Sequence, residues 1–179
     1  MKYVAFLRGV NVGGKNMLPM KDLAQMFVKA GCKDVVTYIQ SGNVVFSAPA
    51  GVVKKLPAQI AAAIEKRFGH KVPVVLRSNE QLARTIDAHR YIKEGKDPKI
   101  CHVLFLADSP TPQAIQALDP NRSPGDSYEV LGGEIYLHLL TGAAKTKLTN
   151  AYFDSKLATV STGRNWATVL KLFELSAAR

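Results

Sequence analysis

Apolar residues switch between two spacings in the first half of the chain, which predicts alternating strands and helices. Runs typical of buried or paired strands occupy Lys2 to Leu7, Val35 to Ile39, Val44 to Phe46 and Val72 to Leu76. Helical spacing predicts one helix between Pro19 and Gly31 and a second from about Lys54 to Phe68. The predicted order β-α-β-β-α-β is that of a split-βαβ, or ferredoxin-like, unit.

The second half of the chain partly repeats this order. Ser78 and Gln81 predict a capping box for a short helix, and the polar connection from His89 to Lys99 is the predicted boundary. The segments that follow are a strand from Cys101 to Leu106, a helix from Pro112 to Leu118, a hairpin of Tyr128 to Leu131 and Glu134 to Leu140, and helices over Leu148 to Leu157 and Trp166 to Leu175. We therefore expect an α+β fold of two subdomains, residues 1–88 and 100–179. The second partly repeats the order of elements of the first, as βαββαα, and ends in a helical C-terminal tail.

Composition narrows the classes of partner. The chain has 179 residues, of which 47% are apolar, and a net charge of +10, which favours anionic partners such as nucleic acid or nucleotides. No segment approaches the ~20 apolar residues of a membrane span, and the first apolar run ends at Arg8, too early for a signal peptide. Cys32 and Cys101 form no disulfide framework. We expect a soluble, cytoplasmic protein that does not bind a membrane.

The densest polar segment directly follows the first predicted strand. Residues Arg8 to Asn16 have the G-x-x-x-x-G-K spacing that begins a phosphate-binding P-loop. However, Asn16 stands where a Ser or Thr hydroxyl would bind magnesium, and the helix begins too late, near Pro19. A nucleotide-hydrolysing P-loop is therefore disfavoured, and an ordinary glycine-rich turn is the main alternative. Gly13 and Gly14 still allow backbone amides to approach a ligand, and such amides bind anions.

Topology places a second polar segment beside this loop. In a split-βαβ sheet, the end of the first strand and the turn between the second and third strands lie at one edge. We therefore expect the glycine-rich loop to lie beside the turn from Gln40 to Asn43. Neither segment contains a carboxylate, so the arrangement favours binding an anion over moving protons. The candidate ligand-binding residues of the two segments are Arg8, Asn11, Gly13, Gly14, Lys15, Asn16, Gln40, Ser41 and Asn43.

Another polar concentration lies towards the C-terminus, in residues 145–150 and 161–166. Its hydroxyls, amides and cations are the usual contacts of phosphate groups, and we expect it to lie close enough to the glycine-rich loop to contribute. The candidate ligand-binding residues here are Lys147, Arg164 and Asn165, although Asn165 is also a typical helix N-cap.

Other chemistries have weaker support. Trp166 could stack on a base, but it shares a helical face with Val169, Leu170 and Phe173, so we predict that it is buried. His102 and His138 could meet across adjacent strands, but without acids or thiols nearby we expect no metal and no cofactor. The chain has no G-x-S-x-G nucleophile elbow and no evident pair of hydrolytic carboxylates.

Three stretches of the chain resemble the signatures of the domain-of-unknown-function 1697 family (DUF1697). They are R-G-V-N-V-G-G-K-N at Arg8 to Asn16, Y-I-Q-S-G-N-V-V-F at Tyr38 to Phe46, and K-L-T-N with G-R-N-W-A-T-V towards the C-terminus. The resemblance extends over nearly the whole chain. It implies a bacterial protein of two α+β subdomains and implies no activity. The polar residues that match the family's motifs are Arg8, Asn11, Lys15, Asn16, Gln40, Ser41, Asn43, Lys147, Arg164 and Asn165. Residues 143–146 depart from the pattern, because Lys145 stands where an Arg is expected and lacks its bidentate fork.

The sequence thus favours a protein that binds a phosphate-bearing anion, either nucleic acid or a nucleotide-like ligand. One alternative is an enzyme that acts on an anionic metabolite and uses Lys15 or Arg8 to stabilise charge. The other is a protein-interaction module whose polar loops only hold the fold. The sequence makes no prediction of the oligomeric state.

Overall fold

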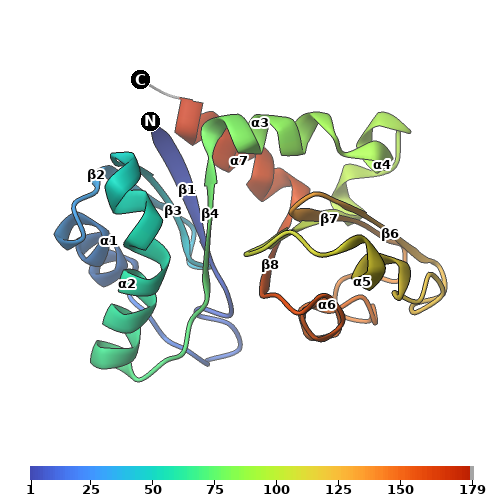
Figure 1. Ribbon diagram of the computed structural model, residues 1–179, viewed down its shortest axis with the longest axis horizontal. Helices are drawn as coiled ribbons and strands as arrows, with labels where there is room; N and C mark the ends of the chain where they lie inside the picture. The colour runs from blue at the N-terminus through green and yellow to red at the C-terminus, as the bar shows by residue number, and fades with distance from the viewer. Residues whose placement is uncertain (178–179) are drawn as a thin grey trace. The chain divides into compact units, whose positions relative to one another are not determined.

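A computed structural model describes residues 1–177 of the chain (Figure 1). Its contacts divide the described chain into two units, one formed by Met1–Ala83 together with residues 171–177, the other by Arg84–Leu170. Each unit contains a four-stranded sheet whose neighbouring strands are all antiparallel. Helices cover one face of each sheet through a cluster of buried apolar residues. The predicted α+β fold of two subdomains is confirmed.

The first sheet has the strand order β2-β3-β1-β4. Its strands are β1 (Lys2–Leu7), β2 (Lys33–Tyr38), β3 (Asn43–Ser47) and β4 (Val74–Ser78). Strand β3 lies between β1 and β2 and is antiparallel to both, so β1 and β2 run in the same direction. This is the ferredoxin-like arrangement that the sequence predicts.

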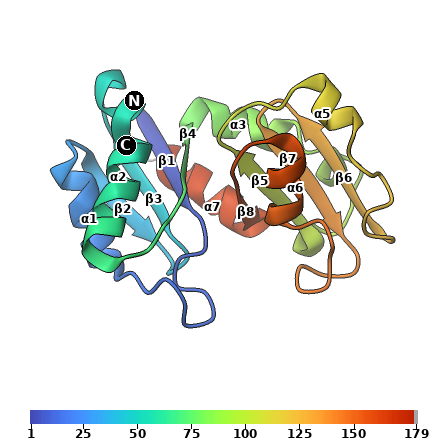
Figure 2. The same ribbon diagram turned by 60° about the horizontal axis from the view of Figure 1, so that its bottom comes forward.

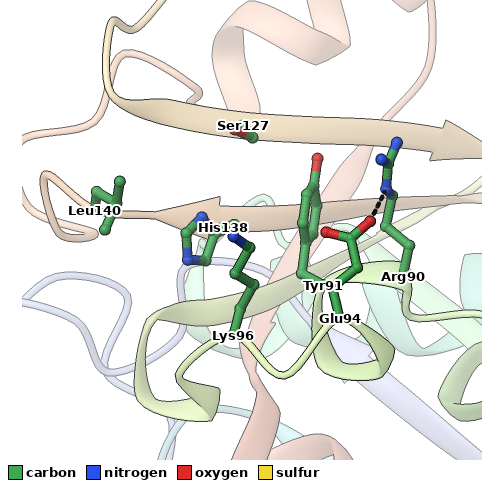
Figure 3. A pocket seen from close by; sticks show the side chains of 7 residues that line it. All are labelled: Arg90, Tyr91, Glu94, Lys96, Ser127, His138 and Leu140. Atoms are coloured by element: carbon green, nitrogen blue, oxygen red, sulfur yellow. Dashed lines mark hydrogen bonds and ion pairs between the residues drawn. The ribbon is translucent and has the colours of Figure 1, made fainter.

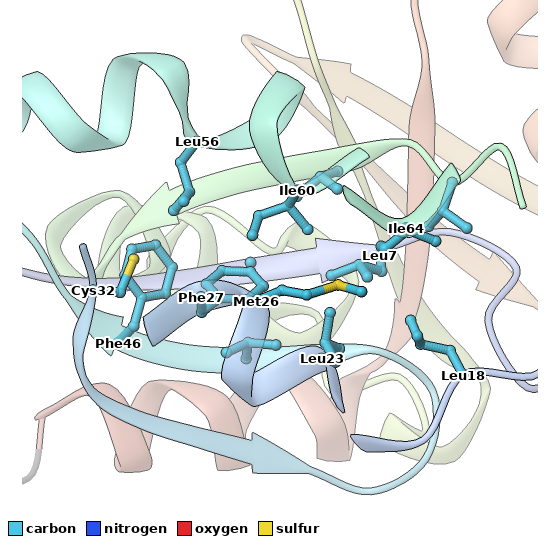
Figure 4. Packing of buried hydrophobic residues seen from close by; sticks show 14 of the residues in the cluster. Leu7, Leu18, Leu23, Met26, Phe27, Cys32, Phe46, Leu56, Ile60 and Ile64 are labelled. Atoms are coloured by element: carbon cyan, nitrogen blue, oxygen red, sulfur yellow. The ribbon is translucent and has the colours of Figure 1, made fainter. Parts of the chain in front are cut away.

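Two helices bury one face of the first sheet: α1 (Met20–Lys29) and α2 (Ala50–Phe68). Leu23 and Phe27 of α1 pack with Leu56 and Ile60 of α2 against sheet residues such as Phe46 (Figure 4). All five are almost fully buried, and burying a side chain of this size stabilises a fold by about 1.5–3 kcal/mol. The helical spacing in the sequence therefore marks the core.

The segment between the two sheets is more structured than its polar sequence indicates. Helix α3 (Asn79–Asp87) begins with the predicted capping box: the Ser78 backbone N–H donates to Gln81 Oε1 over 2.8 Å, and the Gln81 N–H donates to Ser78 Oγ over 3.1 Å. A short helix, α4 (Arg90–Lys93), and a 3-10 turn, η1 (Pro98–Ile100), then occupy the predicted polar connection. His89, at the start of that connection, is fully buried.

The second sheet has the order β6-β7-β5-β8, the same order as the first when its strands are counted along the chain. The strands are β5 (Cys101–Leu106), β6 (Asp126–Leu131), β7 (Glu134–Leu139) and β8 (Ser161–Asn165). The helices of this half are α5 (Pro112–Gln116), α6 (Asn150–Leu157) and α7 (Trp166–Ala177). Figure 2 shows α6 lying across the face of this sheet.

The prediction that the second half only partly repeats the first is wrong. We predicted no strand in residues 161–165, and this segment forms β8. This segment is polar and lacks an apolar alternation, yet it pairs along its whole length with β5. Gly163 faces Leu104 in that ladder, and a Cβ at this glycine would lie only 2.7 Å from Leu104 Cδ2. The second unit is therefore a complete βαββαβ repeat of the first, followed by α7.

The two sheets also correspond in register. In the first, Val4 of β1 is paired with Arg77 of β4, and in the second, Val103 of β5 is paired with Arg164 of β8. Both arginines are buried. Equivalent positions in the two units can therefore be compared residue by residue.

Candidate functional site

The glycine-rich loop after β1 lies beside the β2–β3 turn, which confirms the prediction that they share one edge of the sheet. The Asn11 side-chain Nδ2 donates to the Gln40 carbonyl over 2.8 Å. The Leu7 backbone N–H donates to the Gly42 carbonyl over 2.8 Å. Figure 2 shows the loop projecting beyond the end of β1. The two segments are thus joined by direct hydrogen bonds.

Gly42 makes this close approach possible. Its φ of 79° lies in the left-handed region, which favours glycine. A Cβ at this position would lie 2.7 Å from Leu7 Cβ, a distance that real Cβ atoms do not show. The glycine of the Q-S-G-N stretch is therefore needed to seat the turn against β1.

Three predicted ligand amides hold the loop and turn in shape. Asn11 Oδ1 accepts from the Leu18 backbone N–H over 2.7 Å, and Asn11 Nδ2 also donates to the Leu18 carbonyl over 2.9 Å. Asn16 Nδ2 donates to the Gly9 carbonyl over 3.0 Å. Asn43 is fully buried and donates within its own turn. These side chains position the loop backbone, and their direct contact with a ligand stays a prediction.

A third segment, which the sequence reasoning missed, meets the same edge. The Arg8 backbone N–H donates to the Pro73 carbonyl over 3.1 Å, and His70 Nε2 is hydrogen-bonded to the Met17 carbonyl over 3.0 Å. The connection from α2 to β4 therefore adds His70 and Lys71 to the edge. The signal was available, because β4 is antiparallel to β1 in this topology and starts where β1 ends.

We call residues 8–17, 39–42 and 70–73 together the cationic edge. They contain Arg8, Lys15 and Lys71 and no Asp or Glu. Lys15 and Lys71 are exposed, and within residues 1–177 the Lys15 ammonium has no ion-pair partner. Gly13 and Gly14 are exposed, with φ of 56° and 74°, and nothing lies within 4 Å of the place a Cβ would take. An anion can therefore reach both the cations and the loop backbone.

The second unit builds the equivalent edge without cations. There the Leu106 N–H donates to the Gly133 carbonyl and the Ala107 N–H to the Val160 carbonyl, both over 2.8 Å. These bonds repeat the pairings made by β1 at the cationic edge. Ala107 takes the place of Arg8, Asp108 follows it, and residues 107–111, 132–133 and 158–160 contain no Lys or Arg. The fold does not need positive charge to form such an edge.

The C-terminal polar segment lies in the second unit. It is linked by hydrogen bonds to the buried side chain of Asp126 in β6. The Lys147 backbone N–H donates to Ser123 Oγ over 3.1 Å, and Ser123 Oγ donates to Asp126 Oδ2 over 2.7 Å. Burial acts to raise the pKa of Asp126, but hydrogen bonds from Thr141, Thr146 and Ser123 outweigh it and lower that pKa. The Lys147 side chain itself is exposed.

Arg164 and Asn165 have structural contacts in the same unit. The Arg164 guanidinium is buried, donates to Thr162 Oγ1 over 2.9 Å and to the Gly163 carbonyl over 2.7 Å, and burial lowers its pKa to about 10. Asn165 Oδ1 accepts from the Thr168 N–H over 2.9 Å, which confirms it as an N-cap. The expectation that this segment contributes to the site of the glycine-rich loop stays a prediction.

Two further expectations concern aromatic and imidazole rings. Trp166 is only 5% exposed, so its predicted burial is confirmed, although Leu170 is 42% exposed and does not share the buried face. The idea that His102 and His138 meet is wrong: His102 is paired with Leu137, one residue before His138, so the two rings lie on opposite faces of the sheet.

Residues 1–177 offer neither a cluster of metal ligands nor a membrane-spanning helix. Within this range no three His, Cys, Asp or Glu side chains group closely enough to hold a metal ion. No helix in the same range is long and apolar enough to cross a membrane.

Comparisons with known proteins identify a family and a fold. Residues 1–136 match the family described as "Protein of unknown function (DUF1697)". A conserved bacterial protein from Streptococcus pneumoniae, whose structure is solved, is 22% identical and superimposes with a TM-score of 0.69 over 97% of each chain. At this identity the likeness shows the fold alone. No curated protein matches the chain significantly.

Proposed function

This chain belongs to the DUF1697 family, and we propose that it binds a phosphate-bearing anion, part of a nucleic acid or a nucleotide-like molecule, at the cationic edge of its first unit. The observation that carries this proposal is the contrast between the two repeats. One edge collects Arg8, Lys15 and Lys71 with no carboxylate, and the equivalent edge of the second unit has no cation. Because the same backbone forms without these charges, their presence at one edge favours a binding role.

The chemistry of the edge suits an oxyanion. Arginine presents a planar fork of donors, and lysine a compact ammonium, and both make charge-assisted hydrogen bonds to phosphate. The exposed Gly13 and Gly14 leave room for a ligand to approach the backbone. The side-chain amides of Asn11 and Asn16 keep the loop in one conformation, which reduces the entropy lost on binding.

Exposed apolar side chains at the edge favour a ligand that is more than inorganic phosphate. Val12 is 59% exposed, Met17 57% and Ile39 50%. Ile39 also has a φ of 49°, which is unusual and strained for a β-branched residue. A nucleoside phosphate, with an anionic group and a flat apolar base, can contact both the cations and these side chains.

The charges at the edge favour binding over catalysis. Arg8, Lys15 and Lys71 supply positive charge, and residues 8–17, 39–42 and 70–73 contain no Asp or Glu that could act as a general base. The remaining titratable group, His70, has its Nε2 occupied by the Met17 carbonyl. A role as a protein-interaction module would use the same apolar side chains without an anion, and ligand titration separates the two.

The direct test is calorimetric titration of the full chain with inorganic phosphate, nucleotides and short oligonucleotides. We expect Lys15→Met to weaken binding about 10- to 100-fold, because a hydrogen bond to a charged group contributes roughly 1.5–3 kcal/mol. Lys33→Met is the matched control, since Lys33 is exposed and starts β2 at the opposite end of the same sheet. Its affinity should equal that of the wild type.

Two outcomes would reject the proposal. Equal affinity in the wild type and Lys15→Met would remove the loop from the site, and no heat with any of the three probes would favour the interaction module. The salt dependence then separates the ligands. Nucleic acid releases counterions on binding and its affinity falls steeply with salt, whereas a single nucleotide shows a shallow slope.

A further inference from the structure

The second unit contains a pocket of about 460 Å³ on the face of its sheet that α5 and α6 leave uncovered (Figure 3). Its volume lies within the range of small-molecule sites, which runs from roughly 300 to 1,000 Å³. Six polar or aromatic side chains line it: Arg90, Tyr91, Glu94, Lys96, Ser127 and His138. Nothing in the sequence motifs pointed to this pocket.

Strand pairing and α4 bring these side chains together. Ser127 of β6 and His138 of β7 are directly opposed in the antiparallel ladder, so their side chains lie on the same face. Helix α4 covers part of that face, and the ring of Tyr91 stacks on His138 with centroids 5.6 Å apart and planes inclined by 25°. Tyr91 and His138 are 6% and 7% exposed, so the floor of the pocket is built from buried rings.

A tight helix ending places Lys96 at the pocket. Gly95 follows α4 with a φ of 76°, and its N–H donates to the Ile92 carbonyl over 3.0 Å. The Lys96 N–H donates to the Tyr91 carbonyl over 2.9 Å. These two bonds form a Schellman motif, which holds the backbone of Lys96 against the helix that carries Tyr91. In Figure 3 the Lys96 side chain points towards His138, and both line the pocket.

The two cations of the pocket differ in how their charges are balanced. Arg90 is paired with Glu94 over 3.0 Å and with Glu129 over 3.3 Å. Within residues 1–177, by contrast, Lys96 has no ion-pair partner. Lys96 is therefore the positive charge that remains for a ligand. Burial raises the pKa of Tyr91 to about 12, so its phenol stays protonated and can donate a hydrogen bond.

We propose that this pocket binds a small hydroxylated molecule that carries one oxyanion group, a carboxylate or a phosphate monoester. Lys96 and His138 bind the oxyanion, and the hydroxyls of Tyr91 and Ser127 bind the hydroxyl groups of the ligand. Arg90 and Glu94, paired with each other, form one wall of the pocket. The assignment is independent of the cationic edge, because every residue that lines the pocket belongs to the second unit.

The test uses three probes that share a glycerol skeleton: glycerol 3-phosphate, glycerate and neutral glycerol. Binding to the full chain is followed by the backbone amide NMR signals of Lys96 and Ser127. We expect saturable shifts of these signals with glycerol 3-phosphate or glycerate, and none with glycerol. The stronger of the two anionic probes identifies the oxyanion. Equal shifts with glycerol, or no shift with either anion at about 10 mM, would overturn the proposal. At that concentration a ligand with a Kd of about 1 mM already occupies most of the sites.

Variants separate this pocket from the cationic edge. Lys96→Met should weaken binding of the anionic probe about tenfold or more, because it removes a charge-assisted hydrogen bond. Lys93→Met is the matched control, since Lys93 is exposed on the same helix and does not line the pocket. Lys15→Met should also leave the Lys96 and Ser127 shifts unchanged. If Lys96→Met binds like the wild type, or if Lys15→Met abolishes the shifts, the pocket is not the binding site.

Discussion

Replacing His89 with phenylalanine should change how the stability of the second unit depends on pH. The His89 ring is fully buried and is surrounded by aromatic rings, with centroids 4.9 Å from Tyr136, 4.7 Å from Trp166 and 6.1 Å from Tyr91. Within residues 1–177 neither ring nitrogen has a hydrogen-bond partner. Burial therefore disfavours the charged imidazolium and lowers the pKa of His89 to about 4.

The sign and size of the effect follow from this lowered pKa. In the unfolded chain the His89 pKa returns to its ordinary value of 6.5. As the pH falls from 6.5 towards 4, the unfolded chain binds a proton that the folded chain does not, so stability is lost. Over that window the loss from His89 amounts to about 3 kcal/mol, at 1.36 kcal/mol per pH unit. Phenylalanine keeps a flat ring in the same aromatic cage and removes the titrating group.

The assay is denaturant unfolding at several pH values between 4 and 7.5, followed by tryptophan fluorescence. Trp166 is the single tryptophan of the chain and lies against His89, so it reports on this unit. We expect His89→Phe to lose about 3 kcal/mol less than the wild type between pH 6.5 and 4. Burial lowers the pKa of His102 too, but His102 is present in both proteins, so the difference between the two profiles reports chiefly on His89. Parallel stability profiles for the two proteins would refute the reasoning.

Two further predictions concern the positions that shape the first unit and the helix that follows it. Gly42→Ala should destabilise the fold by about 2–4 kcal/mol in thermal or denaturant unfolding, because the backbone is left-handed there and the new Cβ would clash with Leu7. Gly13→Ala should cost only about 1–2 kcal/mol, because its backbone is also left-handed but no atom lies near the new Cβ. An equal cost at both glycines would contradict the steric argument. Ser78→Ala should lower stability by about 1 kcal/mol, since it removes the acceptor for the Gln81 N–H, and an unchanged unfolding midpoint would show that this cap contributes nothing.

Local patterns were sufficient wherever a segment's own residues specify its conformation. The bounds of β1 and β5 match the apolar runs that predict them, because both strands lie inside their sheets and most of their residues are buried. The Ser78–Gln81 capping box and the Asn165 N-cap are likewise local, since each hydrogen bond spans three residues. The convergence of the glycine-rich loop and the β2–β3 turn followed from strand order alone.

Other features depend on partners that are distant along the chain. Residues 161–165 have no strand pattern of their own and become β8 because β5 supplies a ladder of backbone partners. The residues around His89 are mostly polar, so the sequence predicts an exposed connection there. The His89 ring is nevertheless buried, because α4, β7 and Trp166 surround it. Lys96 and Ser127 are ordinary surface residues in sequence, and only the packing of α4 on β6 and β7 places them in one pocket.

For this protein, the sequence by itself determined the order of elements in the first half, the identity of its core and the meeting of two polar loops. These properties follow from side-chain periodicity and chain connectivity, and both can be deduced from the order of the residues. The tertiary structure alone decided that the second half is a full repeat, that the segment of Lys71 meets the segments of Arg8 and Lys15, and that a pocket forms on the second sheet. Backbone pairing, burial and charge balance are properties of groups that meet in space, so no single segment encodes them.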